Sequence, residues 1–357
     1  MTEPRFIAKP DWYTSDSPQT LGATGRPLRW GVVGTGNIAA TVTEDLVLLE
    51  DAILHSVSSR SQAKVAHFAS RFGFASHYYD DGGIPGYQRL VQDPEVDVVY
   101  IATPHAQHFT VAKAALEAGK HVLCEKAFTI NAREAAELIR LATERKLFLM
   151  EAVWARFVPG MQRSFDIIAS GEIGQVQWVH ADLSFLVPDD PAARIWAPKD
   201  GGGALLDLTM YPLLWACGAL GAPQPVRATG TLTELGVDSQ NAITLAYSSG
   251  AQAQLMSSLT AVGPESAVVA GSKGFLQTVG SVNNPAALTV QTGRGDTRVE
   301  TFEPVGSGYT YQLREVTRCI QQGLTESPTM PLADSLAIMH LFDGIWAQLG
   351  VVYPNDA

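Results

Sequence analysis

Three side chains capable of chemistry stand in two short stretches of the sequence, HVLCEKAFTI and GGGALLDLTMYP. Lys126 follows Glu125 at the end of the apolar run in the first stretch. Asp207 and Tyr211 lie four residues apart in the second, a spacing that places both on one face of a helix. A phenol can exchange a proton with a substrate, and a nearby ammonium stabilises its phenolate form. Lys126 and Tyr211 are therefore candidates for proton transfer if the fold brings them together.

Each of these residues also has a structural interpretation. Lys126 could be a solvated lysine paired with Glu125, and Asp207 could be a carboxylate on an exposed helix face. Tyr211 could be a core residue beside a bend, because the proline that follows it lacks the N–H of a helical hydrogen bond. The helices and strands that position the three residues distinguish the functional from the structural interpretation.

The stretch LRWGVVGTGNIAATVTEDLVLL predicts a strand, a glycine turn and a helix. Gly34 would allow the tight turn, Gly36 would let a diphosphate approach the backbone, and Ala39 would let the helix lie close to the strand. The free N–H groups at the start of the helix would face the phosphates. We therefore predict that a dinucleotide-binding turn is formed by Gly34, Thr35, Gly36, Asn37 and Ile38. The alternative is a plain glycine turn.

The second expected strand, AILHSVSS, ends without the acidic residue that an NAD site usually offers to the ribose hydroxyls. Ser59 and Arg60 stand there instead, and a hydroxyl and a guanidinium suit a 2′-phosphate. This pattern favours NADP over NAD, and the predicted cofactor site also includes Lys64 in the helix that follows. The alternative is that Arg60 only caps that helix.

Alternating strands and helices over residues 28–153 predict a doubly wound parallel sheet of the Rossmann type, and hence an α/β protein. Ligands of such sheets bind at the carboxyl ends of the strands, where Thr103 and Lys126 both fall. This position favours the functional interpretation of Lys126. The predicted cofactor site continues with Thr103, Pro104, His105, His108, Glu125 and Lys126.

No metal site is predicted. His105 and His108 are expected to shape the nicotinamide side of the cleft or to cap the following helix, because two histidines alone make a poor metal site. The three cysteines are far apart and show neither a disulfide framework nor a zinc-binding spacing. We therefore expect a reduced, cytoplasmic environment.

Composition narrows the class of partner. The chain has 357 residues, 46% of them hydrophobic and 17% charged, which is enough for two domains with cores. Its formal net charge of -11 argues against nucleic acid or an anionic membrane as the main partner. We find no signal-peptide pattern and no stretch resembling the roughly 20 apolar residues of a membrane helix. A small-molecule ligand is the expectation that remains.

The second half changes rhythm from about Phe157, with period-two alternation that predicts a large, mostly antiparallel sheet. A broad sheet face without helices over it would need a partner, so we expect self-association through that face. The predicted division is an arm over residues 1–27, which we expect to be loose and to pack on a neighbour, a Rossmann domain over 28–153, a substrate and oligomerisation domain over 154–335, and a closing helix and tail over 336–357.

Several motifs together resemble the Gfo/Idh/MocA family of NAD(P)-dependent oxidoreductases: WGVVGTGNIA, VVYIATPHAQH, AGKHVLCEKAFTINAREAAEL, LMEAVWARFVP and GGGALLDLTMYP. Within it, the chain is most similar to the branch of dimeric dihydrodiol dehydrogenases and NADP-dependent D-xylose 1-dehydrogenases. The resemblance implies a Rossmann domain, a second α/β domain with an open sheet, and a homodimer. The chain departs from the family's Glu-Lys-Pro signature at Ala127, and it carries Tyr211 where many relatives have histidine.

By this resemblance, a hydride would pass between the nicotinamide and a hydroxyl or carbonyl carbon of a sugar or cyclic diol. Tyr211 would be the acid–base group, Lys126 would lower its pKa, and Asp207 would bind a substrate hydroxyl or orient Lys126. The candidate pocket walls are Trp154, Arg156, Phe157 and Trp196, although Arg156 could instead form a structural ion pair. Two other functions stay open: transient oxidation that permits glycoside cleavage, and non-catalytic nucleotide sensing.

Overall fold

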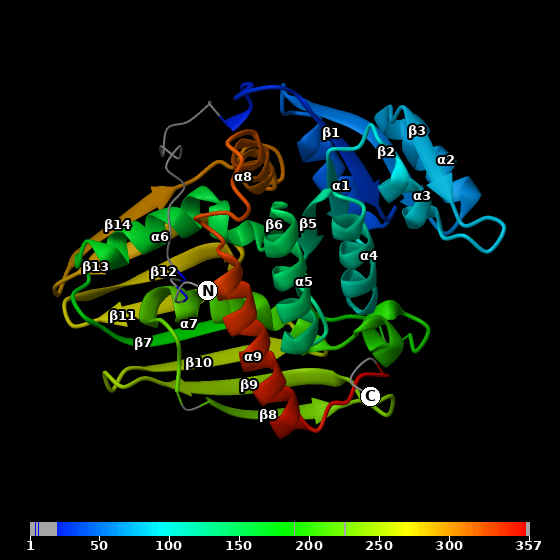
Figure 1. The fold of residues 1–357 in the computed structure, drawn as a ribbon. Helices are drawn as coiled ribbons and strands as arrows, with labels where there is room; N and C mark the ends of the chain where they lie inside the picture. The colour runs from blue at the N-terminus through cyan, green and yellow to red at the C-terminus, as the bar shows by residue number, and fades with distance from the viewer. Residues whose placement is uncertain (1–3, 5, 7–19, 189, 225, 355–357) are drawn as a thin grey trace.

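Two sheets form the framework of the protein, and the computed structural model describes residues 4, 6, 20–188, 190–224 and 226–354 (Figure 1). The first sheet is parallel, with six strands in the order β3-β2-β1-β4-β5-β6. Its strands are β1 (Leu28–Val33), β2 (Ala52–Ser59), β3 (Ser76–Tyr79), β4 (Val98–Ile101), β5 (His121–Glu125) and β6 (Leu149–Ala152). The helices between them are α1 (Asn37–Leu46), α2 (Gln62–Phe72), α3 (Gly86–Gln92), α4 (His105–Glu117) and α5 (Ala132–Arg145).

The apolar runs in the sequence explain this sheet. All four residues of β4 and all four of β6 are buried, as expected for strands covered on both faces. The strand order reverses between β1 and β4, and an open parallel sheet binds ligands at such a reversal. Gly34 has a φ of 121° there, and a Cβ on it would lie 2.6 Å from the Ala102 oxygen, so the turn requires glycine. The predicted Rossmann fold is confirmed.

The second sheet has eight strands in the order β14-β13-β12-β11-β7-β10-β9-β8, antiparallel except between β7 and β10. Its strands are β7 (Val176–Ser184), β8 (Val226–Leu232), β9 (Asp238–Ala246), β10 (Gln252–Ser258), β11 (Ala267–Gly271), β12 (Gly274–Ser281), β13 (Asn284–Thr292) and β14 (Asp296–Thr301). Its helical elements are η2 (Trp154–Phe157), α6 (Pro159–Ala169), η3 (Arg194–Trp196), η4 (Pro198–Asp200), η5 (Leu205–Thr209), α7 (Met210–Leu220), α8 (Thr310–Gln321) and α9 (Leu332–Leu349). The predicted mostly antiparallel sheet is confirmed.

The two faces of the second sheet differ. Helices α6, α7 and α9 lie over one face (Figure 1), and the residues that point toward them are apolar and buried. On the other face the strands leave large apolar side chains exposed, namely Trp178, Met256, Val279 and Val299. The chain therefore has the open apolar face that the sequence predicts, while self-association through it stays a prediction.

The described part of residues 1–27 packs on its own chain, which differs from the loose arm we expected. Phe6 is 3% exposed, and its backbone N–H donates to Asp334 Oδ2 at 2.9 Å. The Arg314 guanidinium donates from Nε to the Thr20 carbonyl at 2.7 Å and from Nη1 to the Thr24 hydroxyl at 2.9 Å. A buried arginine on α8 thus fixes the segment that enters β1. Contact between the arm and a neighbouring molecule concerns residues that lie largely outside the described ones.

One helical segment is apolar enough to need comment, although we expected none. Residues Pro198–Leu220 match a membrane-spanning helix in length and composition, yet 83% of the apolar window is buried inside the protein. The segment packs against β7 and β10 of the second sheet. A helix in a protein core is apolar all round for the same reason as one in a membrane. Its composition is explained by this burial.

Candidate active site

A cavity of about 520 Å³ opens at the reversal between β1 and β4. The N-terminus of α1 faces it, and Gly36 at the N-cap position provides no side chain to bond the first N–H groups of the helix. Free N–H groups of this kind bind phosphate, so the residues fit a dinucleotide's diphosphate. Residues predicted for the cofactor that line the cavity are Gly34, Thr35, Gly36, Asn37, Ile38, Ser59, Arg60, Lys64, Thr103 and Pro104.

The end of the cavity beside β2 carries hydroxyls and cations. The Thr35 hydroxyl donates to Ser59 Oγ at 3.1 Å, which fixes Ser59 beside the glycine turn. The cap of α2 is Ser61, whose side chain accepts from the Lys64 backbone N–H, so Arg60 is not the capping residue. Arg60 and Lys64 are exposed cations at the rim, where they can reach an anionic ribose substituent.

Lys126, Asp207 and Tyr211 meet at the carboxyl end of β5. Lys126 Nζ donates to the backbone carbonyl of Asp207 at 2.7 Å and lies 5.3 Å from the centre of the Tyr211 ring. The ammonium is therefore held by Asp207 and does not pair with Glu125 as a solvated lysine would. The structure brings together the three residues that the sequence pattern singled out, from elements 81 positions apart in the chain.

The local fold around Asp207 explains how its carbonyl becomes available. Residues Leu205–Thr209 form a π-helical turn, whose typical hydrogen bond runs from an N–H to the carbonyl five residues before it, although the Asp207 N–H bonds to the Gly203 carbonyl four residues before it. The residue five positions after Asp207 is Pro212, which has no N–H to donate. Pro212 also lies in the first turn of α7, where proline is tolerated. The proline that seemed odd in the sequence thus offers no N–H to the Asp207 carbonyl, which accepts from Lys126 Nζ.

Tyr211 is 6% exposed, and its hydroxyl accepts a hydrogen bond from Trp154 Nε1 at 3.0 Å. Burial raises the pKa of Tyr211, and the nearby carboxylates of Glu125 and Asp207 raise it further. We expected Lys126 to lower this pKa, but the net shift in the free protein is upward because burial dominates. Tyr211 is therefore a protonated phenol, ready to donate a proton.

The carboxylate of Asp207 lies beside a guanidinium and an imidazole. Arg194 Nη2 is 3.4 Å from Asp207 Oδ1, and His105 Nε2 is 3.9 Å from the same oxygen. Burial alone would raise the pKa of Asp207, but the surrounding groups, Lys126 first and Arg194 among them, outweigh it and the net pKa is lowered. Asp207 is thus an ionised acceptor beside Tyr211, suited to receive a hydrogen bond from a hydroxyl.

The two predicted histidines hold backbone segments in place. His105 Nδ1 lies 2.7 Å from the Gly201 oxygen, and burial lowers the pKa of its ring. His108 Nδ1 lies 2.8 Å from the Ala127 oxygen and Nε2 lies 2.9 Å from the Thr103 oxygen. The peptide bond between Lys126 and Ala127 is cis. His108 therefore links the end of β4 to the backbone that follows Lys126, while His105 faces Asp207.

Glu125 lies beneath the reactive groups. The Tyr100 hydroxyl donates to its Oε1 at 2.8 Å, and the Lys126 backbone N–H donates to its Oε2 at 3.2 Å. Burial raises the pKa of Glu125 to about 7. The side chain is 5% exposed and does not line the cavity, so it supports Lys126 from below.

The four predicted pocket walls divide into the tryptophans, Trp154 and Trp196, and the pair Arg156 and Phe157. Trp154 stacks on Tyr309 with ring centres 4.4 Å apart, and buried Trp196 donates from Nε1 to the Pro188 carbonyl at 3.0 Å. Arg156 is 2% exposed, and its Nη2 pairs with Asp334 Oδ2 at 2.7 Å. This pairing favours the structural alternative for Arg156.

Phe157 follows Arg156 into the core and is fully buried. Among the described residues, no group of three or more His, Cys, Asp and Glu side chains is arranged to hold a metal ion.

Three residues of the site were not predicted from the sequence. Arg194 lines the cofactor cavity and reaches Asp207, Tyr309 stacks on Trp154, and the Asn283 side chain acts to lower the pKa of Tyr211. Arg194 begins the short 3-10 helix η3, and Asn283 and Tyr309 lie in turns, none of which shows a sequence periodicity. The GSGYTY stretch around Tyr309 offered only a glycine turn before a helix. No sequence pattern pointed to these residues, because their positions depend on contacts across the fold.

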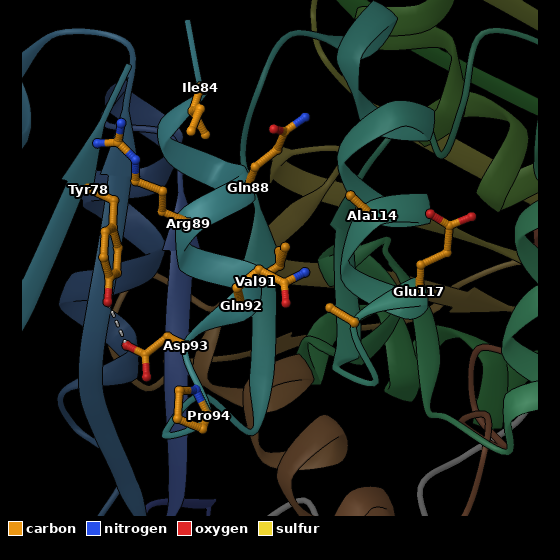
Figure 2. A pocket seen from close by; sticks show the side chains of 11 residues that line it. Tyr78, Ile84, Gln88, Arg89, Val91, Gln92, Asp93, Pro94, Ala114 and Glu117 are labelled. Carbon is orange, nitrogen blue, oxygen red and sulfur yellow. Dashed lines mark hydrogen bonds between the residues drawn. The ribbon is translucent and has the colours of Figure 1, made fainter. Parts of the chain in front are cut away.

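A second hollow, of about 770 Å³, lies between α3 and α4 and contains none of the predicted site residues (Figure 2). Tyr78 and Asp93 meet in it, with the hydroxyl donating to Asp93 Oδ2 at 3.0 Å. His55 Nε2 lies 3.1 Å from the same oxygen, and Glu95 donates its backbone N–H to Asp93 Oδ1 at 2.9 Å. The buried carboxylate is thus fully occupied by its own neighbours, which indicates a structural role.

Comparison with known proteins agrees with this architecture. The model of the oxidoreductase family with an NAD-binding Rossmann fold matches residues 28–153, and the model of the GFO/IDH/MocA C-terminal domain matches residues 161–277. Trans-1,2-dihydrobenzene-1,2-diol dehydrogenase of Mus musculus is 34% identical over 343 residues, which cover 92% of this chain and 99% of the relative. D-xylose 1-dehydrogenase (NADP(+)) of Hypocrea jecorina is 35% identical over 377 residues, which cover 93% and 95% of the two chains.

A solved structure gives the same result for the fold. The crystal structure of a 3-ketoreductase from Actinomadura kijaniata, in complex with NADP and TDP-benzene, has a TM-score of 0.81 and 26% identity. The match covers 91% of this chain and 98% of that chain. Fold, cavity and relatives agree on one class of protein, a nicotinamide dinucleotide-binding oxidoreductase. The chain belongs to the Gfo/Idh/MocA family, as its motifs predicted.

Proposed function

We propose that the protein is an NADP-dependent oxidoreductase that moves a hydride between the nicotinamide and a hydroxyl or carbonyl carbon of an aldose or a cyclic trans-diol. The observation that carries this proposal is the meeting of Lys126 Nζ, Asp207 and Tyr211 next to Arg194, which lines the dinucleotide cavity. The names of two relatives, a dihydrodiol dehydrogenase and a D-xylose dehydrogenase, support the substrate class.

Each residue has a role in the proton step. When bound, the nicotinamide would accept or return the hydride. Tyr211 donates its proton to the developing alkoxide during reduction and accepts the hydroxyl proton during oxidation. The Lys126 ammonium, held against the Asp207 carbonyl, stabilises the phenolate that forms when the proton leaves. The ionised Asp207 carboxylate receives a hydrogen bond from a neighbouring substrate hydroxyl, which orients the reacting carbon.

The preference for NADP rests on the rim of the cavity. Ser59, Arg60 and Lys64 offer one hydroxyl and two cations and line the cavity beside the end of β2. Asp80 also lines the cavity, and its Oδ1 accepts a hydrogen bond from the Gly86 backbone N–H at 2.7 Å. We also propose that the protein works in the cytoplasm as a homodimer or a higher homo-oligomer joined through its open sheet.

A screen of aldoses, inositols and trans-dihydrodiols with NADP+ and with NAD+, followed by NAD(P)H absorbance, tests the proposal. We expect turnover on at least one of these classes and a higher kcat/KM with NADP+ than with NAD+. Net cofactor reduction separates this function from transient oxidation and from nucleotide sensing, since neither leaves reduced cofactor behind. Binding of NADPH without turnover on any class would contradict it.

The variant Lys126→Met tests the mechanism. Because the role is charge stabilisation, we expect kcat to fall by about 10² to 10³ while the Kd for NADPH stays close to the wild-type value. Lys113→Met is a matched control, because Lys113 is paired with Glu137 on the outside of the first domain. Wild-type turnover in the Lys126 variant would contradict the assignment.

A further inference from the structure

Arg194 is a residue of the second domain that enters the cofactor cavity of the first. Among the described residues, the others that line this cavity all come from the first 107 positions of the chain. The Arg194 guanidinium also lies 3.4 Å from Asp207 Oδ1 and is 43% exposed. It therefore stands between the dinucleotide cavity and the reactive groups.

The segment that carries Arg194 is held at both domains. The Gly203 backbone N–H donates to the Ile195 carbonyl at 2.8 Å, which closes the segment on itself. The Gly201 oxygen lies 2.7 Å from His105 Nδ1 on α4, and the Gly202 oxygen accepts from the Tyr353 hydroxyl at 2.6 Å. A Cβ on Gly202 would lie 2.4 Å from the Ile195 oxygen, so the path requires glycine there. Arg194 is thus built into a fixed position.

A cation near the glycine turn would add to the binding of a diphosphate there. A dinucleotide brings a diphosphate with two negative charges to Gly34–Ile38, where α1 offers N–H donors and no side-chain charge. Arg60 and Lys64 follow β2 and lie at the ribose end of the cavity. Among the described residues that line the cavity, Arg194 is the one lysine or arginine besides Arg60 and Lys64. Its planar guanidinium can bond a phosphate and a carboxylate on different edges.

We propose that Arg194 is a positioning residue that binds the diphosphate of the dinucleotide with one edge of its guanidinium and Asp207 with the other. This inference rests on the proposed function, because it takes the cavity to hold a dinucleotide. The contact would link the two domains through the ligand, and the same guanidinium already lies beside the Asp207 carboxylate.

Binding measurements on the full-length protein test the proposal without turnover. We expect Arg194→Ala to raise the Kd for NADPH by about tenfold or more, as for the loss of one charge-assisted hydrogen bond. The Kd for 2′-AMP, which has the 2′-phosphate but no 5′-diphosphate, should change by less than about twofold. Arg194→Lys should recover part of the NADPH affinity, because lysine restores the positive charge without the planar set of N–H donors of a guanidinium. Lys199→Ala removes an exposed cation from the same segment and should bind like the wild type.

A double-mutant cycle with Asp207→Asn tests the second contact. If one guanidinium serves both groups, the effect of Arg194→Ala on NADPH affinity should differ between the two backgrounds by more than about twofold. Equal effects in both backgrounds would overturn the bridge to Asp207.

The binding data also separate this inference from the function on which it rests. Wild-type NADPH affinity in Arg194→Ala, or an equal loss for NADPH and 2′-AMP, would overturn the diphosphate contact alone. A wild-type protein that binds neither NADPH nor NADH would overturn the proposed function as well.

Discussion

Tyr211 lies in surroundings that keep its phenol protonated, and this has a direct consequence for the direction of reaction. Burial and the charges of Glu125 and Asp207 raise its pKa above the ordinary value near 10. A phenol with such a pKa stays protonated over the whole physiological range, so the proton is present for donation. As a base it must first lose that proton, and the fraction ionised grows with pH.

The pH dependence of the two directions should therefore differ. We expect kcat/KM for oxidation to rise by about tenfold per pH unit through the neutral and mildly alkaline range, because the phenolate is the base. Reduction should keep its rate over the same range, since the phenol stays protonated. Initial rates in both directions across a pH series check this. Tyr211→Phe should be nearly inactive and should lose the rise; a wild-type oxidation rate independent of pH would exclude Tyr211 as the base.

At the scale of elements, the sequence allowed the framework of the site to be predicted but not its details. Apolar runs ending in Gly34 and Lys126 predicted the strands and their reactive edge, because burial on both faces leaves few other patterns. The sequence predicted an ordinary helix at Asp207 where the structure has a π-turn, and the contact of the Asp207 carbonyl with Lys126 joins residues distant in sequence. The ion pair of Arg156 was an open alternative without a named partner, because Asp334 lies far along the chain. Arg194 was not predicted, because its contact with Asp207 depends on how the segment between them folds.

The π-turn gives a prediction for Pro212. In Pro212→Ala a new N–H could bond the Asp207 carbonyl and displace Lys126 Nζ from it. We expect kcat to fall by about tenfold or more with little change in NADPH affinity, and the free energy of unfolding to change by no more than about 1 kcal/mol. Steady-state kinetics and thermal unfolding measure the two effects.

Pro159→Ala is a matched control, because Pro159 also lies in the first turn of a helix but away from Lys126. Full activity in the folded Pro212 variant would show that the proline does not determine the position of Lys126.

For the whole molecule, the open face of the second sheet raises the question of assembly. Trp178 and Met256 project from neighbouring strands β7 and β10 and are 46% and 42% exposed, which is unusual for large apolar residues on one face. A symmetric pair of such faces would cover both. We propose that this face joins two copies of the chain.

Trp178→Glu should weaken that association because it would bury an unpaired charge. Sedimentation velocity over a range of protein concentrations should show a dimer for the wild type and a larger monomer fraction for the variant. Val262→Glu places the same charge on an exposed loop residue outside the strands and should leave the dimer intact. A wild type that sediments as a monomer at every concentration would rule out this use of the face.

Tyr353, close to the C-terminus, contacts the segment that carries Arg194. It is 1% exposed, its ring lies 5.0 Å from that of Trp346, and its hydroxyl holds the Gly202 carbonyl. A substitution there would look harmless by distance in sequence from Lys126 and Tyr211. It would nevertheless loosen the segment that carries Arg194. Variants in this tail therefore belong with active-site variants when natural sequence changes in this protein are interpreted.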